Sequence, residues 1–329
     1  MSATVTVPRG VELCHLPQPF ELVRGGQLSG AVLAYERQGP KDAPVVIVLG
    51  GISAHRHAAA HAELPERGWW EGVVGAGLGI DTERFQVLGI DWLGGAGNST
   101  TPSAGEAFPF VDAADQARAL WALCDALKIE RVHAIVGSSY GGMVAQHAAV
   151  QSAAAQNGSR LDRLVVLAAA DRSHAQASAY RHVQRQLVEL GSRSGTQRES
   201  LQLARSLAMV GYRTTAELGD RFDGGLDDAA LSGWLDARGA SFADEWGVEQ
   251  FLCLNRSIDA HDIETASIKV PTWVLGFDSD QLVPLVDVHR FAASLPELRT
   301  LRECRTRYGH DGFLKEAAVV SGFLTEVLR

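Results

Sequence analysis

A serine flanked by glycines, in Gly137-Ser138-Ser139-Tyr140-Gly141, is the segment of this sequence best suited to covalent chemistry. A β-branched run precedes it and a helix-forming run follows it, so the serine falls on a strand-to-helix turn. Such a nucleophile elbow is tight and needs small residues at 137 and 141. The pattern predicts that Ser139 is a nucleophile beside the first N–H groups of the helix. A glycine-rich connection packed for structural reasons is the alternative.

A serine hydroxyl needs a base to take its proton, and the base needs an acid that fixes its tautomer. In proteins with this elbow the order along the chain is nucleophile, acid, histidine. Of the 11 histidines, His310 lies between the last expected strand and the final helix, where the base belongs. Asp278 and Asp280 both follow the preceding strand. The loop position of Asp280 favours it as the acid, and Asp278 is suited to hold the turn.

An acyl-transfer site also needs two backbone donors for the developing oxyanion. The N–H of Tyr140, directly after the nucleophile, is one. The other is expected from the glycine-rich loop after residues 45–49, where Gly51 and Ile52 are the two candidates. A plain glycine turn is the alternative for this loop.

The elements around these residues predict an α/β fold. Two stretches of mixed polarity, 13–22 and 29–38, indicate antiparallel edge strands. Continuous apolar runs alternate with helical segments, which is typical of a parallel sheet covered on both faces. The expected strands are 45–49, 85–90, 132–136, 164–168, 272–277 and 299–303, and the expected helices are 112–127, 143–155, 285–294 and 312–328.

The alternation breaks in the middle of the chain, which predicts a helical insertion. We expect a core of residues 1–171 and 269–329, and a cap of residues 172–268 over the carboxyl ends of the strands, where such sheets bind ligands. A lid that excludes water suits acyl chemistry, whereas a merely decorative insertion is the alternative. The expected cap helices are 173–190, 198–209, 214–222, 227–236 and 248–260.

Composition excludes several classes of protein. The chain has 329 residues and a formal net charge of −9, which argues against nucleic-acid binding. Its four cysteines are scattered without metal-binding spacing, so we expect reduced thiols, no metal site and a cytoplasmic location. We find neither a secretory signal nor an apolar run of membrane-spanning length.

Several stretches between residue 68 and the C-terminus together resemble the homoserine O-acetyltransferase family, whose members have the α/β-hydrolase fold. The combination is more specific than the elbow alone, because a general esterase has no need of the cap and C-terminal motifs. The matching stretches are Gly68-Trp69-Trp70 through Phe85, Gly94-Gly95 with Ser99-Thr100, Gly141-Gly142-Met143, Leu203-Ala204-Arg205 to Tyr212-Arg213-Thr214, Asp278-Ser279-Asp280 and Tyr308-Gly309-His310-Asp311-Gly312-Phe313-Leu314.

The resemblance implies a ping-pong reaction in methionine biosynthesis. Ser139 takes an acyl group from an acyl-CoA and passes it to the hydroxyl of L-homoserine, with no permanently bound cofactor. By the same resemblance, Arg205 binds the substrate carboxylate with Tyr212 beside it, and Asp311 pairs with the substrate ammonium. One fixed cation and one fixed anion would orient a zwitterion. The family also implies a homodimer formed through the cap helices.

Departures from the family pattern leave the substrates open. They include Tyr140 in place of a methionine, a shorter cap, and the basic residues Arg56 and His57, which could meet a succinyl carboxylate, CoA phosphates or solvent. We favour acetyl-CoA over succinyl-CoA as donor, and L-serine is a close alternative acceptor because one methylene discriminates weakly. A serine esterase, with water as acceptor, is the alternative from another class of enzyme. A catalytically silent relative that binds a small ligand is the last alternative.

Overall fold

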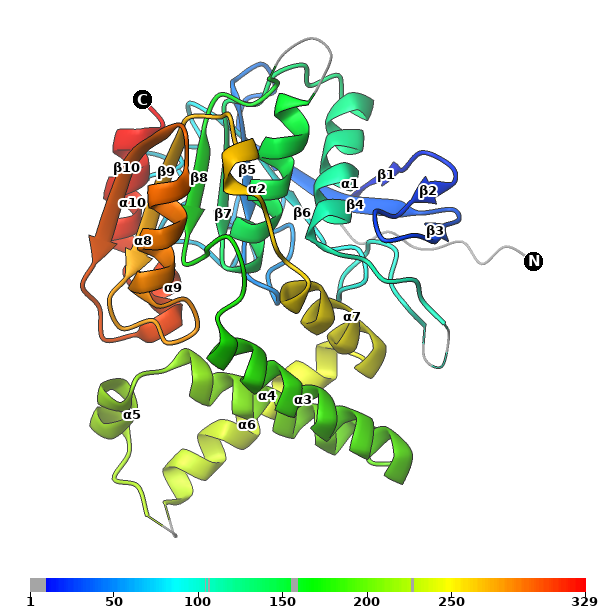
Figure 1. Ribbon diagram of the computed structural model, residues 1–329, viewed down its shortest axis with the longest axis vertical. Coiled ribbons are helices and arrows are strands. Elements are labelled where there is room, and N and C mark those ends of the chain that lie inside the picture. The colour runs from blue at the N-terminus through cyan, green and yellow to red at the C-terminus, as the bar shows by residue number, and fades with distance from the viewer. Residues whose placement is uncertain (1–9, 104, 106, 155–158, 226–227) are drawn as a thin grey trace.

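An eight-stranded, mostly parallel sheet forms the centre of the computed structural model (Figure 1), which describes residues 10–103, 105, 107–154, 159–225 and 228–329. The strand order is β1-β4-β6-β5-β7-β8-β9-β10, in which β1, β4 and β6 pair antiparallel and the others parallel. The strands are β1 (Glu12–His15), β4 (Val32–Gln38), β5 (Val45–Leu49), β6 (Gln86–Ile90), β7 (Ala134–Ser138), β8 (Leu164–Leu167), β9 (Thr272–Phe277) and β10 (Leu298–Cys304). This is the α/β-hydrolase type of sheet that the sequence predicts.

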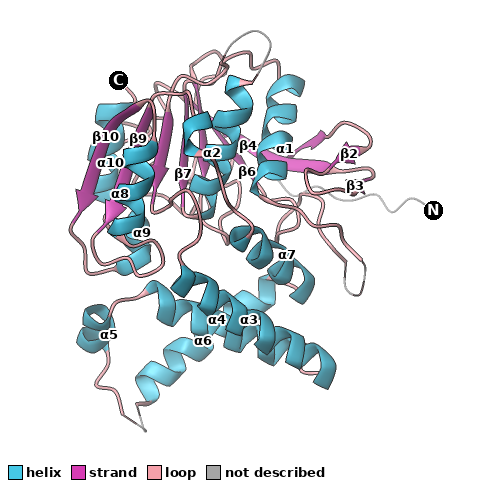
Figure 2. Ribbon diagram, in the orientation of Figure 1, coloured by secondary structure: helices cyan, strands magenta, loops and turns pink. Residues whose placement is uncertain are grey.

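Both faces of the sheet are buried, because side chains alternate between two apolar layers. From β5, Val45, Ile47 and Leu49 belong to one layer, and Val46 and Val48 to the other. Helices α1 (Ala113–Ala126), α2 (Tyr140–Ala153) and α8 (Leu285–Ser294) contribute to the first layer, and α10 (Ala317–Val327) contributes to the second. The short α9 (Gly312–Lys315) precedes α10. A separate two-stranded ribbon, β2 (Phe20–Glu21) and β3 (Gln27–Leu28), lies beside β4 (Figure 2).

The segment between β8 and β9 is helical in its described residues and lies across the end of the sheet to which the strands point (Figure 1). Helices α3 and α4 pack against each other, and α6 packs against α4. Their bounds are α3 (Ala175–Ser194), α4 (Gln197–Tyr212), α5 (Thr215–Arg221), α6 (Ala229–Glu245) and α7 (Val248–Asp259). None of the described helices combines the length and apolarity needed to cross a membrane.

Most expected elements are shifted by up to four residues at their ends, residues 155 and 227 of two expected helices lie outside the described residues, and three elements differ more strongly. The edge strand 13–22 is divided into β1 and β2, and Pro17 and Pro19, which lack a backbone donor, stand between them. Helix 227–236 instead runs to Glu245 as α6. The last helix, 312–328, is interrupted at Glu316, which joins α9 to α10.

Candidate active site

Ser139 occupies the tight turn between β7 and α2. Its φ of 53° and ψ of −121° are strained for a residue with a side chain. A Cβ on Gly137 would lie 2.3 Å from the carbonyl oxygen of Gly141, and one on Gly141 would lie 2.2 Å from that of Leu49. A side chain at 137 would therefore collide with the turn itself, and one at 141 with the end of β5, so either would displace the serine.

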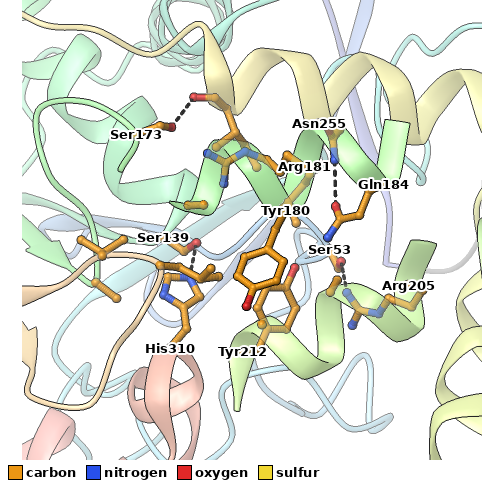
Figure 3. A pocket seen from close by; sticks show the side chains of 18 of the residues that line it. Ser53, Ser139, Ser173, Tyr180, Arg181, Gln184, Arg205, Tyr212, Asn255 and His310 are labelled. Atoms are coloured by element: carbon orange, nitrogen blue, oxygen red, sulfur yellow. Dashed lines mark hydrogen bonds between the residues drawn. The ribbon is translucent and has the colours of Figure 1, made fainter. Parts of the chain in front are cut away.

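A continuous hydrogen-bonded chain joins three distant parts of the sequence. The Oγ of Ser139 lies 2.8 Å from Nε2 of His310 (Figure 3), and Nδ1 of His310 lies 2.7 Å from Oδ2 of Asp280. Burial of His310 opposes its charged form, but the charge of Asp280 and its hydrogen bond outweigh burial, so the pKa of His310 is raised above its ordinary value. The carboxylate also fixes the tautomer, which leaves Nε2 free to accept the serine proton.

The two candidate acids have different partners. The other oxygen of Asp280 accepts hydrogen bonds from the N–H groups of Leu282 and Val283, at 2.8 and 3.0 Å, which orient the carboxylate toward the imidazole. Asp278 instead accepts a hydrogen bond from the N–H of Thr306 at 2.9 Å and so links the loops after β9 and β10. Only Asp280 therefore has the geometry that the base requires.

The expected oxyanion donors lie around Ser139. Tyr140 is the first residue of α2, so its N–H has no acceptor within that helix. A Cβ on Gly51 would lie 3.8 Å from the Cβ of Ser139, and Ile52 lines the same cavity as the serine. The side chain of Tyr140 has a different role: it is fully buried, and its hydroxyl lies 2.7 Å from Oγ of Ser257 on α7.

A cavity between the sheet end and the helical insertion contains Ser139 and His310 together with residues of α3, α4 and α7. The ring of Tyr212 lies between the imidazole of His310, at 5.8 Å, and the guanidinium of Arg205, at 5.6 Å. The guanidinium also lies 4.9 Å from the ring centre of Phe242 and 3.5 Å from the hydroxyl of Ser53 (Figure 3). In the described part of the chain no carboxylate lies within 4.0 Å of it, so this cation can take an anionic ligand.

Two further arginines line the cavity. Arg181 on α3 is paired with Asp259 at 2.7 Å, and burial lowers its pKa. Arg172 is exposed and, like Arg205, has no carboxylate partner among the described residues. The cavity thus has two unpaired guanidinium groups and one neutralised group.

The structure does not bring every expected residue into the cavity. The carboxylate of Asp311 pairs with Arg213, which also approaches Glu217, and Asp311 is not among the cavity residues. Arg56 pairs with the fully buried Asp91 at 2.7 Å and lies outside this cavity. The imidazole of His57 contacts Glu36 and the carbonyl of Glu66 instead.

Sequence patterns did not single out Tyr180, Arg181, Gln184 or Asn255, which also line the cavity. Figure 3 shows these side chains converging from α3 and α7. A polar residue on an amphipathic helix has the same spacing whether it meets solvent or a ligand, so no local signal was available. Ser53 is different, because its place in the glycine-rich loop after β5, directly after Ile52, is a local signal.

The chain matches the family of the alpha/beta hydrolase fold over residues 44–317. It is 43% identical to a homoserine O-succinyltransferase of Xanthomonas campestris pv. campestris over 90% of this chain and 79% of that protein. It is 32% identical to a homoserine O-acetyltransferase of Leifsonia xyli subsp. xyli over 93% of this chain and 86% of that protein. Among solved structures, esterase E22 superposes with a TM-score of 0.84 at 20% identity, covering 97% of this chain and 99% of that chain, a likeness of fold alone.

Proposed function

Because the chain belongs to the homoserine O-acyltransferase family of α/β-hydrolase-fold enzymes, we propose that it transfers an acyl group from acyl-CoA to the hydroxyl of L-homoserine. The observation that carries this proposal is the chain Ser139–His310–Asp280 beside a cavity with the unpaired guanidinium of Arg205. The triad supports acyl transfer, and the cation supports an acceptor with a carboxylate. This activity would place the enzyme in methionine biosynthesis.

In the first half-reaction His310 takes the proton of Ser139 as the serine oxygen attacks the thioester carbonyl. The oxyanion receives hydrogen bonds from the N–H of Tyr140 and from that of Gly51 or Ile52. The carbon–sulfur bond then breaks, and the imidazolium returns its proton to the leaving CoA sulfur. Acyl-CoA is a co-substrate in this scheme, and no bound cofactor takes part.

In the second half-reaction Arg205 binds the carboxylate of homoserine, with Tyr212 as one wall of the cavity. The substrate hydroxyl gives its proton to His310 and attacks the acyl carbonyl. The bond between that carbonyl and Oγ of Ser139 then breaks, and the imidazolium returns its proton to Oγ. Asp311 remains our candidate for the substrate ammonium. Since Arg213 holds its carboxylate, the ammonium would have to share that carboxylate.

We propose succinyl-CoA as the donor, although the sequence alone favours acetyl-CoA. A succinyl donor and a homoserine acceptor each have a free carboxylate, and Arg172 and Arg205 are two unpaired cations in one cavity. The relative at 43% identity is named a succinyltransferase, and the one at 32% an acetyltransferase. Contact of Arg172 with CoA phosphates is the competing interpretation.

Thiol release from succinyl-CoA and from acetyl-CoA, each with and without L-homoserine, tests the proposal. We expect a stoichiometric burst of CoA without acceptor, and turnover only when homoserine is present. Turnover that is indifferent to the amino acid would instead identify an esterase of the same fold. L-serine in parallel assays measures the acceptor preference, which one methylene would shift by about 10- to 200-fold.

We further propose that residues 172–268 act as a cap and mediate a homodimer. Helices α3 and α4 expose apolar side chains that a second copy would cover, namely Val183, Leu190, Leu203 and Val210. Light scattering of the purified protein at several concentrations tests this, and a monomer at all of them would refute it. The four unpaired cysteines support a cytoplasmic location, where thiols stay reduced.

A further inference from the structure

Three potential metal ligands meet outside the candidate active site. Glu36 lies on β4, and His57 and His61 lie in the loop that follows β5. Oε1 of Glu36 is 2.8 Å from Nδ1 of His57 and 3.1 Å from Nε2 of His61, and the three ligand atoms lie within 4.8 Å of one another. This carboxylate–diimidazole cluster has no part in the reaction described above.

The charge of Glu36 lacks a permanent counter-ion. Its residue is 5% exposed, and in the described part of the chain its ion-pair partners are these two histidines, with no arginine or lysine. The adjacent Arg56 is paired with Asp91. A buried carboxylate of this kind is costly unless a positive charge faces it. A second observation points to a ligand here: Oε2 of Glu36 is buried and has no hydrogen-bond partner among the residues that the structure describes.

The hydrogen bonds of His57 determine which of its nitrogens is free. Nε2 lies 2.8 Å from the carbonyl oxygen of Glu66, which only accepts, so Nε2 must carry a proton. In the neutral imidazole Nδ1 then has a lone pair directed at the carboxylate of Glu36, which is repulsive without a proton or a cation between them. Histidines that bind metals commonly donate their second N–H to a carbonyl in just this way.

We propose that Glu36, His57 and His61 bind one Zn²⁺ ion. One carboxylate and two imidazoles form a donor set that suits this ion, and a water molecule would complete four-coordination. Tetrahedral zinc with bonds of about 2.0–2.1 Å separates its ligand atoms by about 3.3 Å. The two contacts to Glu36 would therefore widen by a few tenths of an ångström, and the two histidine nitrogens, which lie within 4.8 Å of each other, would take up the same separation.

The ion would link the loop of residues 50–69, which follows β5, to strand β4 of the sheet. Near its start, the segment from Gly50 to Trp69 contains Gly51 and Ile52, the candidate oxyanion donors, and it contributes Ser53 to the cavity. A Cβ on Gly89 of β6 would lie 2.0 Å from the carbonyl of Arg56, so this loop rests directly on the sheet beside the cluster. Zinc at the cluster would hold the loop at a second point.

Zinc binding to the tag-free, full-length enzyme tests the proposal. After chelator treatment and dialysis, titration with Zn²⁺ followed by elemental analysis should show one ion per chain. Glu36→Gln and His61→Gln should each weaken binding by more than about 100-fold, since even the loss of an outer-shell partner costs 10- to 100-fold. Saturating zinc should raise the melting temperature of the wild type by about 3–6 °C and leave that of the variants unchanged.

His147→Gln is the matched control, because His147 also contacts a histidine, His261 at 3.2 Å, without a carboxylate. It should bind zinc as tightly as the wild type. Equal binding by wild type and Glu36→Gln, or no saturable binding by the wild type, overturns the proposal and leaves a cluster held by hydrogen bonds alone. If a ligand variant fails to fold, the wild type alone tests the proposal. One Zn²⁺ per chain, together with visible absorption of the Co²⁺ form typical of four-coordination, supports it, and the lack of either contradicts it.

Discussion

Ser139, Asp280 and His310 stand on loops that leave β7, β9 and β10, whereas Arg205 and Tyr212 stand on α4 of the helical insertion. The three residues of the first, sheet-borne group are joined by hydrogen bonds of 2.7–2.8 Å. In the second, helix-borne group, the tilted ring of Tyr212 lies 5.8 Å from that of His310, and the guanidinium of Arg205 lies 3.5 Å from the hydroxyl of Ser53. The register of parallel strands fixes the first group, while the second depends on how one helical layer rests on the sheet. From this comparison we propose that the sheet supplies the chemistry and that the insertion selects the substrate.

The strongest test of this division is Ser139→Ala, which removes the nucleophile. We expect a loss of at least about 10⁴-fold in turnover and no acyl-enzyme in the intact mass spectrum. Ser138→Ala is the matched control, because Ser138 is fully buried and its hydroxyl has no hydrogen-bond partner in the described part of the chain. A burst of CoA that persists in Ser139→Ala would place the nucleophile elsewhere.

Asp280→Asn should lower turnover by about 10³- to 10⁴-fold, because an amide presents the wrong tautomer of His310. Asp278→Asn should stay within about tenfold of the wild type, since its oxygen still accepts the N–H of Thr306. Steady-state rates of both variants compare the two candidate acids directly. Similar losses in the two would contradict the assignment of Asp280.

The pH profile gives a second readout for Asp280. Acylation needs neutral His310, so kcat/KM for acyl-CoA should rise with pH and level off above the raised pKa of His310. Replacing the carboxylate removes the charge that raises this pKa, which moves the rise in kcat/KM to lower pH.

The same raised pKa makes the free energy of unfolding depend on pH. The charged form of His310 stabilises the fold fully below the unfolded pKa of 6.5, and this contribution disappears as the pH rises through the folded pKa.

Sequence patterns locate the sheet-borne group well, because a turn between a buried strand and a helix restricts both residue type and backbone. Gly137 and Gly141 illustrate this, since the close approach of neighbouring backbone excludes a side chain at either position. Sequence patterns do not reveal the pairing of Asp311 with Arg213, because 98 residues separate the two. The position of Tyr180 likewise follows from the packing of α3 over the sheet, which helical periodicity does not encode.

Arg205→Gln should separate binding from chemistry. Loss of a charge-assisted bond to the substrate carboxylate costs about 1.5–3 kcal/mol, which predicts an increase of roughly 10- to 150-fold in the KM for homoserine. The burst of CoA without acceptor should be unchanged, because the sheet-borne group is intact. Arg198→Gln, on the exposed side of the same helix and paired with Asp244, is the control. A collapsed burst in Arg205→Gln would show that the insertion also takes part in acylation.

Arg172→Gln should have the smallest effect, because the side chain is exposed and solvent would screen its ion pair with a substrate anion. If Arg172 meets the succinyl carboxylate, the ratio of kcat/KM for succinyl-CoA to that for acetyl-CoA should fall by up to about fivefold. Arg193→Gln, exposed on α3 away from the cavity, should leave the ratio unchanged. An equal loss with both thioesters would mean that Arg172 meets the CoA portion common to both donors. Donor choice would then depend on the walls of the cavity rather than on this charge.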